Sequence, residues 1–182
     1  MDLFCTAQQI TIFPNKPLAS AHPCTPLLLP VGASFAFMDS VYGAALADTE
    51  REAESPGIGK SHFSPSLFVA STVISVTAPS RAVVDAGTKA IDQLSGPPTV
   101  WNDCGGAGKP LEGVTYRCGG DEHGILEGPS AAEFKVGDTV FLQPSHCDPT
   151  VNLHDQFIFV ERVNGELVAE EPTPIGARGP GC

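Results

Sequence analysis

The pattern of apolar and polar residues changes near residue 66, and from there onward it is typical of a β-rich domain. Segments that are dense in β-branched residues, or that alternate between apolar and polar residues, each predict a strand. These segments are residues 66–77, 81–87, 114–118, 150–160 and the part of 133–144 that follows the Gly137-Asp138 turn signal. In the last strand Val151, Leu153, Phe157 and Phe159 are expected to share one face. Asn164-Gly165, between two apolar segments, predicts a type I′ hairpin.

The first 64 residues follow a different pattern. Five prolines between positions 14 and 30 exclude a long helix or a central strand, so residues 1–29 are expected to form an irregular arm. Residues 34–39 resemble a short buried strand. Residues 42–54 are rich in helix formers and predict an exposed helix, and residues 55–65 form a loop bounded by prolines.

Composition and charge narrow the possible functions. The chain has 182 residues, 42% of them apolar, which is enough for one core. Ten basic against 21 acidic residues give a net charge of −11, which repels phosphate backbones and argues against nucleic-acid binding. No apolar run approaches the roughly 18 residues needed to span a bilayer. We therefore expect a soluble cytoplasmic protein with no membrane partner. Its six cysteines, none with CxxC spacing, are expected to be free thiols.

The segment PSHCDPTVNLHD, residues 144–155, carries the strongest candidate for chemistry. His146 and Asp148 are two positions apart, so on an extended backbone their side chains project to the same side, with Cys147 pointing away. A converging imidazole and carboxylate suit a divalent ion such as Mn²⁺ or Zn²⁺. The alternative is an ordinary solvated pair on a loop, and the spacing alone leaves both open.

Two further places in the sequence, residues 121–123 and Lys89, have side chains that can take part in a reaction. Asp121, Glu122 and His123 follow two glycines, and His123 is a candidate acid–base group because imidazole exchanges protons near neutral pH. The alternative for this cluster is a polar turn. Lys89, in DAGTKA, is a candidate imine-forming lysine. Its alternative is an exposed lysine that opens a helical turn.

Three motifs in order, RAVVDAGTKA, DEHGILEG and KVGDTVFLQPSHCDPTVNLHDQF, carry a family resemblance. Together with LPVGASFAFMDSVY upstream, they resemble the C-terminal part of the D-threonine aldolase and D-serine dehydratase family. The similar region runs over roughly residues 30–180. The resemblance implies an alanine racemase-like fold, in which a TIM-type barrel is followed by a β-rich domain.

The implied fold class is therefore mainly β, with a barrel- or sandwich-like domain. In this interpretation residues 65–182 form the D-serine dehydratase-like domain, residues 30–64 are a remnant of the last βα units of the TIM barrel, and residues 1–29 are the arm. The resemblance places the family's metal-binding pair on His146 and Asp148. Aspartate at the second position resembles the manganese-type aldolases, whereas the zinc-type dehydratases have cysteine there, so Mn²⁺ is favoured over Zn²⁺.

The resemblance also implies pyridoxal phosphate as a cofactor that stabilises a carbanion at Cα. The family's aldimine-forming lysine lies on the first barrel strand, and we expect no counterpart of it here, because Lys89 occupies a different position. Ala33 and Ser34 match the segment whose backbone approaches the cofactor phosphate, although Ala33 stands where the family has glycine. His123, Glu122 and Asp121 are implied to lie near the mouth of the active site as catalytic candidates.

The implied function is that of a D-amino-acid lyase, which performs retro-aldol cleavage or elimination on a D-threonine- or D-serine-type substrate. This chain would be its metal-bearing C-terminal portion. The implied partner is a second copy of the chain or a missing N-terminal barrel half. A non-catalytic metal-binding β-domain and an inactive fragment are the alternatives that remain open.

Overall fold

A computed structural model of the chain describes residues 9–12, 65–104 and 109–176. Strands predominate among these residues, and the helical elements are one 3₁₀ turn, η1 (Pro129–Glu133), and one short helix, α3 (Cys147–Val151). No helix in this part of the chain has the length and apolar character of a membrane-spanning segment.

Several sequence predictions lie outside the described residues. They are the strand at residues 34–39, the helix at 42–54 and the cofactor-binding candidates Ala33 and Ser34. The predicted arm, residues 1–29, is described only over four residues, which form a strand.

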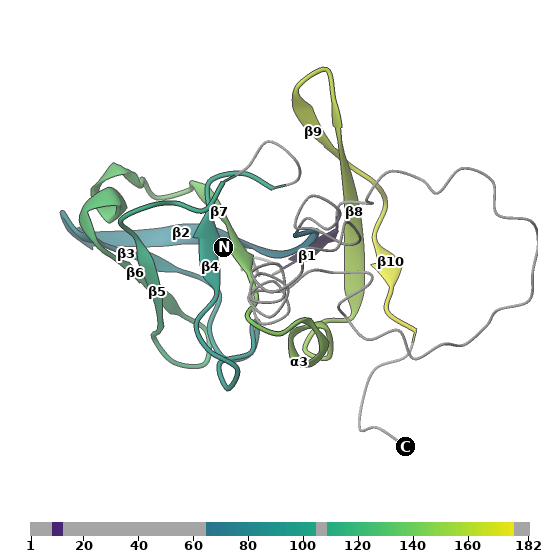
Figure 1. The fold of residues 1–182 in the computed structure, drawn as a ribbon, viewed down its shortest axis with the longest axis horizontal. Helices are drawn as coiled ribbons and strands as arrows, with labels where there is room; N and C mark the ends of the chain where they lie inside the picture. The colour runs from purple at the N-terminus through teal and green to yellow at the C-terminus, as the bar shows by residue number, and fades with distance from the viewer. Residues whose placement is uncertain (1–8, 13–64, 105–108, 177–182) are drawn as a thin grey trace, which may run out of the picture.

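Six strands form a path that curls into a nearly closed barrel (Figure 1). The order is β4-β7-β2-β3-β6-β5, every neighbouring pair is antiparallel, and β4 and β5 at the two ends of the path lie next to each other. The strand bounds are β2 (Leu67–Ala78), β3 (Arg81–Val84), β4 (Thr99–Trp101), β5 (Thr115–Cys118), β6 (Gly124–Glu127) and β7 (Thr139–Gln143). The mainly β fold class is therefore confirmed.

Strand β2 is the longest element and organises the core. Its first half is buried on both faces, as the exposures of Leu67, Phe68 and Val69, all at or near zero, show. The ring of Phe68 meets the ring of Trp101 edge-on, with 5.4 Å between the centroids. The second half pairs with β3 through two register shifts and becomes exposed. The strands predicted at residues 66–77 and 81–87 are thus confirmed, the second ending at Val84.

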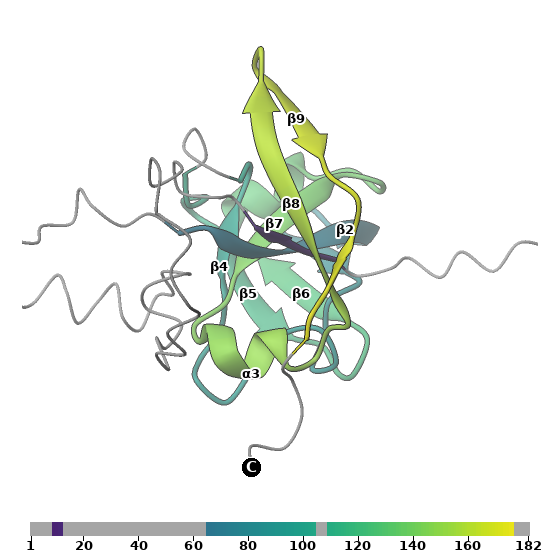
Figure 2. The same cartoon turned by 90° about the vertical axis from the view of Figure 1, so that its right-hand side faces the viewer.

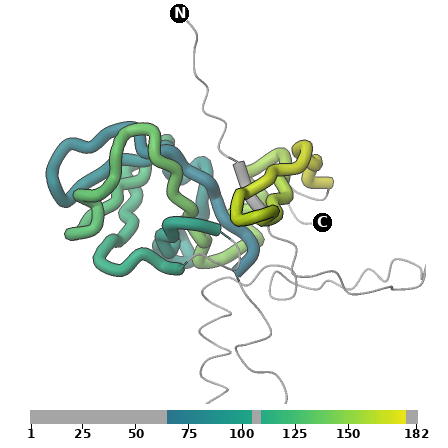
Figure 3. The backbone as a smooth tube through the Cα atoms, turned by 90° about the horizontal axis from the view of Figure 1, so that it is seen from above, coloured from purple at the N-terminus to yellow at the C-terminus, as the bar shows by residue number. Residues whose placement is uncertain are grey.

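A second group of strands lies beside the barrel, as the view from above shows (Figure 3). Strand β8 (Gln156–Val163) pairs antiparallel with β9 (Glu166–Ala169) and β10 (Thr173–Pro174). Strand β1 (Gln9–Ile12) joins this group to the barrel, because it pairs in parallel with β8 and antiparallel with β2. Strand β1 precedes the first proline of the predicted arm, so the irregular structure predicted for residues 1–29 is wrong at these four residues.

The predicted strand at residues 150–160 is wrong in its first half. Residues 147–151 form α3, and β8 begins only at Gln156, so Leu153 does not share a strand face with Phe157 and is 42% exposed. Proline is tolerated in the first turn of a helix, where its missing N–H has no partner to lose, and Pro149 occupies that turn. A helix of five residues is too short to show a helical period in the sequence.

The hairpin between β8 and β9 follows the sequence signal. Asn164 and Gly165 have φ values of 52° and 90°, which are the positive angles that a type I′ turn requires. Figures 1 and 2 show this hairpin projecting on the side of the molecule opposite α3.

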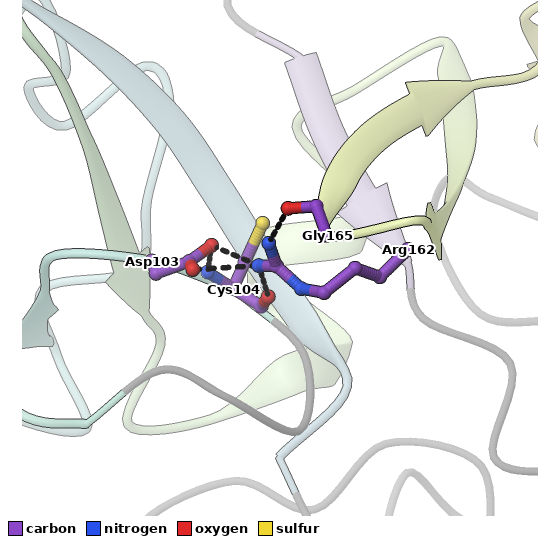
Figure 4. A network of polar contacts seen from close by, with 4 residues as sticks. All are labelled: Asp103, Cys104, Arg162 and Gly165. Atoms are coloured by element: carbon purple, nitrogen blue, oxygen red, sulfur yellow. Dashed lines mark hydrogen bonds and ion pairs between the residues drawn. The ribbon is translucent and has the colours of Figure 1, made fainter.

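Arg162 ties the hairpin to the loop after β4 (Figure 4). Its Nη2 donates to both Asp103 carboxylate oxygens at 2.6 Å, and its Nη1 donates to the Gly165 carbonyl at 2.7 Å. Beside this pair Cys104 is fully buried, and burial together with the Asp103 charge raises the pKa of its thiol to about 12. Cys104 is therefore a protonated packing residue, and it is a free thiol, as are Cys118 and Cys147.

Replacing Arg162 with alanine should loosen the hairpin without unfolding the barrel. The ion pair is about 30% exposed, so its loss should cost about 1 kcal/mol or less of unfolding free energy. Amide hydrogen exchange across β8 and β9 should accelerate. Arg117→Ala, which removes the exposed Arg117–Glu127 pair on β5 and β6, is the matched control and should leave exchange in the hairpin unchanged. Unchanged amide exchange in the hairpin of Arg162→Ala would show that the Arg162–Asp103 ion pair does not stabilise the hairpin.

Candidate functional site

Both polar clusters singled out in the sequence lie against one connection, residues 85–98 between β3 and β4, called here the 85–98 loop. The turn between β5 and β6 meets residues 88–89 of this loop, and the segment that contains α3 meets residues 90–92. Figures 1 and 2 show α3 at one end of the barrel. The candidate site is therefore at the barrel end opposite the β8–β9 hairpin.

His146 and Asp148 flank the start of α3. His146 is the N-cap residue and has an extended backbone, with φ −138° and ψ 127°, while Asp148 is in the first helical turn. The extended geometry assumed from the sequence thus holds at His146 and ends there. Cys147 between them is buried in the core, His146 is half-buried and Asp148 is exposed. Both candidate ligands can therefore be reached from solvent.

Two side chains hold the α3 segment on the 85–98 loop. The Thr150 hydroxyl donates to the His146 carbonyl at 3.0 Å and accepts the Asp92 backbone N–H at 3.2 Å. At the end of the segment, Nε2 of buried His154 lies 2.7 Å from the Ala90 carbonyl oxygen. Because a carbonyl oxygen only accepts, Nε2 carries the hydrogen in this contact.

Asp92 is a buried carboxylate next to this segment, with 8% of the residue exposed. Its oxygens accept the backbone N–H groups of Leu94 and Ser95 at 3.0 and 3.1 Å. Burial alone would raise the pKa of this carboxyl. The hydrogen bonds from Ser95 and Leu94 and the charge of His146 outweigh burial, so the pKa lies below its ordinary value. The His146 ring is thus close enough to Asp92 to interact with it electrostatically.

The turn that carries Asp121, Glu122 and His123 is exposed, and the 85–98 loop engages two of its three side chains. An Asp121 carboxylate oxygen accepts the Thr88 hydroxyl at 3.3 Å, and the Lys89 ammonium donates to Glu122 at 2.5 Å. The backbone N–H groups of Thr88 and Lys89 also donate to carbonyls of this turn, both at 3.1 Å. The structure therefore brings this turn and α3 to neighbouring parts of the same loop.

Lys89 has the environment of a surface lysine. Its ammonium is exposed, and the hydrogen bond and negative charge of Glu122 raise its pKa above the ordinary value of 10.5. A nucleophilic amine has to lose its proton, and this ion pair favours keeping it. The interpretation of Lys89 as an exposed lysine in a turn is the one that the structure supports.

Two glycines in the quoted motifs are required for packing. A Cβ on Gly87 would lie 2.3 Å from the carbonyl oxygen of Gly120, and a Cβ on Gly124 would lie 2.2 Å from the ring of Tyr116. The Tyr116 hydroxyl donates to the Ala86 carbonyl at 2.8 Å, and burial raises its pKa to about 12. These contacts hold the β5–β6 turn tightly against the start of the 85–98 loop.

The donors near α3 suit an open divalent site. Among the described residues no three His, Cys, Asp or Glu side chains form a group that could hold a metal ion. His146 and Asp148 are one imidazole and one carboxylate, a donor set that divalent Mn²⁺ and Zn²⁺ both accept. A pair of protein ligands of this kind would leave the other coordination positions of an ion to water or to a small molecule. The types of donor present beside α3 are therefore compatible with a divalent ion.

Nothing in the sequence pattern singles out Asp92, Thr150 or His154. Asp92 and Thr150 are 58 positions apart, and His154 and Ala90 are 64 positions apart. The only local signal was the spacing of Thr150 four residues after His146, which in a helix lets a threonine hydroxyl reach the carbonyl one turn back. That spacing brings the two residues together only in a helix, and the segment is predicted to be a strand.

A methyl group at position 87 should separate the loop from the β5–β6 turn. Gly87→Ala places a Cβ against backbone atoms, which cannot rotate away, so we expect a loss of about 1–3 kcal/mol of unfolding free energy by urea denaturation. Gly176→Ala makes the same substitution where, apart from its chain neighbours, no atom of the described residues lies within 4 Å, and it should be nearly neutral. Equal stabilities of the two variants would contradict the close approach at Gly87.

Comparison with known proteins agrees with the resemblance found in the motifs. The family model described as "Putative serine dehydratase domain" matches residues 66–160. A D-threonine aldolase from Arthrobacter sp is 40% identical over 147 residues, which are 80% of this chain and 33% of the relative. A 3-hydroxy-D-aspartate aldolase from Paracoccus denitrificans is 38% identical over 148 residues, which are 81% and 34% of the two chains.

Solved structures lead to the same fold. The crystal structure of D-threonine aldolase from Filomicrobium marinum aligns with a TM-score of 0.55 and 36% identity over 78% of this chain and 33% of that one. An alanine racemase-like protein from Idiomarina loihiensis, at 22% identity and a TM-score of 0.50 over 66% and 34% of the two chains, shares the fold.

This chain spans about a third of the length of the relatives it matches. The family match covers more than half of its 182 residues and includes the 85–98 loop, the β5–β6 turn and α3. The motifs, the mainly β fold and the aligned relatives agree, and the chain belongs to the family described as "Putative serine dehydratase domain".

Proposed function

We propose that this chain is the metal-bearing domain of a lyase that acts on β-hydroxy-D-amino acids, and that His146 and Asp148 hold a divalent ion. The names of the relatives, D-threonine aldolase and 3-hydroxy-D-aspartate aldolase, refer to substrates that share a D-configured Cα and a hydroxyl on Cβ. The observation that carries the proposal is that the family match includes an imidazole and a carboxylate that flank α3 and are both reachable from solvent.

The metal would supply Lewis acidity to the substrate hydroxyl, and pyridoxal phosphate would supply the electron sink at Cα. The described residues would bind the metal ion and so orient the substrate that shares it. His146 can offer a ring nitrogen to the ion and Asp148 a carboxylate oxygen. Mn²⁺ is favoured over Zn²⁺ because a carboxylate suits the harder ion and the family resemblance implies cysteine at the position of Asp148 in the zinc-type dehydratases.

His123, Glu122 and Asp121 are proposed to form the rim of the site. Glu122 and Asp121 already engage Lys89 and Thr88, so their role is to hold the β5–β6 turn against the 85–98 loop. The exposed His123 is the member of this cluster that can exchange a proton with a substrate. Ala33 and Ser34, outside the described residues, are proposed to approach the phosphate of the cofactor.

The remainder of the lyase is proposed to be a TIM-type barrel that carries the cofactor. It would belong to a longer form of this protein, or to a second chain, and residues 65–182 would be the domain that closes over it. Residues 30–64 would be the last part of that barrel and residues 1–29 an arm. A metal-binding β-domain without catalysis is the second candidate, and the ion-paired state of Lys89 favours it.

Isothermal titration with Mn²⁺ and Zn²⁺ tests the metal site directly. The metal-free chain should bind one divalent ion. His146→Ala and Asp148→Asn should each weaken binding by more than the ~10–100-fold typical of a supporting residue. Glu133→Gln is the matched control, since it removes an exposed carboxylate outside the proposed site, and it should bind as the wild type does. Absence of binding by the wild type would remove the metal from the proposal.

A chimera tests the lyase activity. The barrel part of the Arthrobacter D-threonine aldolase would be fused to residues 66–182 of this chain, in place of the region that they match. With pyridoxal phosphate and Mn²⁺, the chimera should release aldehyde from D-threonine or 3-hydroxy-D-aspartate but not from L-threonine. His146→Ala in the chimera should abolish the release. A folded, metal-binding chimera that cleaves neither D-substrate would favour the non-catalytic metal-binding domain.

A further inference from the structure

Thr150 is a completely buried hydroxyl residue whose hydrogen-bonding capacity is used on two different segments. Its exposure is 0%, and a buried hydroxyl is costly unless its partners are present. The hydroxyl donates its hydrogen to the His146 carbonyl at 3.0 Å and accepts the Asp92 N–H at 3.2 Å. It therefore joins the backbone of a proposed metal ligand to the 85–98 loop.

The loop side of this contact is fixed. Ala90 and Ile91 are fully buried, and the Asp92 carboxylate accepts the N–H groups of Leu94 and Ser95, which closes a turn around it. The Asp92 N–H therefore projects from a part of the loop that packing and hydrogen bonds already hold in place.

The position of α3 depends on hydrogen bonds to the rest of the molecule. A five-residue helix is far below the ~12–15 residues at which an isolated helix becomes even marginally stable, so α3 takes its position from its contacts. Thr150 provides a contact near the middle of the segment, and His154 provides another at its end through the Ala90 carbonyl. Of the two side chains that bond to the loop, Thr150 also donates a hydrogen bond to the His146 carbonyl.

We propose that Thr150 is a positioning residue for metal binding: its hydroxyl fixes the backbone of His146 to the 85–98 loop, so that His146 and Asp148 are held where they can bind one divalent ion. This inference rests on the proposed function, since it requires that His146 and Asp148 are metal ligands. Metal coordination tolerates deviations of only about 0.2 Å in its distances, so a freed α3 would have to pay for its own ordering when the ion binds. Groups that orient metal ligands in this way typically change affinity by about 10–100-fold.

The test compares three variants by isothermal titration with Mn²⁺. Thr150→Val keeps the size of the side chain and removes the hydroxyl, and it should weaken Mn²⁺ binding by about 10–100-fold. Thr150→Ser keeps the hydroxyl and should recover most of the affinity. Ser130→Ala removes another hydroxyl that donates to a carbonyl, that of Glu112 at 2.7 Å, outside the loop and α3. It should leave Mn²⁺ affinity unchanged whatever it does to the melting temperature.

Amide hydrogen exchange on the metal-free proteins provides a second measurement. The Asp92 amide and the amides of residues 146–148 and 150–152 should exchange faster in Thr150→Val than in the wild type and in Ser130→Ala. If Thr150→Val does not fold, His154→Phe removes the other hydrogen bond to the loop and should likewise weaken Mn²⁺ binding.

The outcomes separate the inference from the proposed function. Weaker binding in Thr150→Val with recovery in Thr150→Ser supports the positioning role. Wild-type affinity in Thr150→Val, or in His154→Phe where that variant takes its place, overturns the inference and leaves His146 and Asp148 as ligands. A wild-type chain that binds no Mn²⁺ overturns the inference and the proposed metal site together.

Discussion

The close contact between the 85–98 loop and the β5–β6 turn is the constraint on which the candidate site depends. At Gly87 the two backbones approach so closely that no side chain fits, and two backbone hydrogen bonds join them immediately afterwards. This contact fixes the start of the loop, and packing of Ala90 and Ile91 in the core fixes its middle. The α3 segment is then built onto that surface through Thr150 and His154. The position of His146 and Asp148 is therefore a consequence of how the 85–98 loop is packed, through contacts that join residues 58 and 64 positions apart.

The barrel gives this arrangement its rigidity. Strand β2 pairs along its length with three other strands, and its first half is buried on both faces, so the strands that lead into and out of the 85–98 loop are anchored in one core. The β8–β9 hairpin, held by Arg162 and Asp103, lies on the opposite side, away from α3 (Figures 1 and 4). The molecule thus separates a firmly packed end, which presents the candidate ligands, from a projecting hairpin that is held by a partly exposed ion pair.

Several polar residues that attract attention in the sequence turn out to stabilise the fold. Lys89 and Glu122 neutralise each other across the loop contact, and Asp121 accepts the Thr88 hydroxyl. The glycines of the DAG and EHG motifs are required where backbones or a tyrosine ring approach. Lys89, Glu122 and Asp121 therefore have structural partners, which leaves His146 and Asp148 beside α3 as the proposed metal ligands and His123 as the proposed proton-exchanging residue.

The sequence by itself determined the features that depend on neighbouring residues. It located β2, β3, β5 and β7 from β-branched or alternating residues, the type I′ turn from Asn164-Gly165, and the family from ordered motifs. It missed the short strands β1, β4, β6 and β10, whose two to four residues carry little pattern, and it placed a strand where α3 forms. Only the tertiary structure decided that the Asp92 N–H and the Thr150 hydroxyl, 58 positions apart, form a hydrogen bond next to the His146 carbonyl. Contacts between distant segments depend on how the whole core packs, and no local period or spacing specifies them.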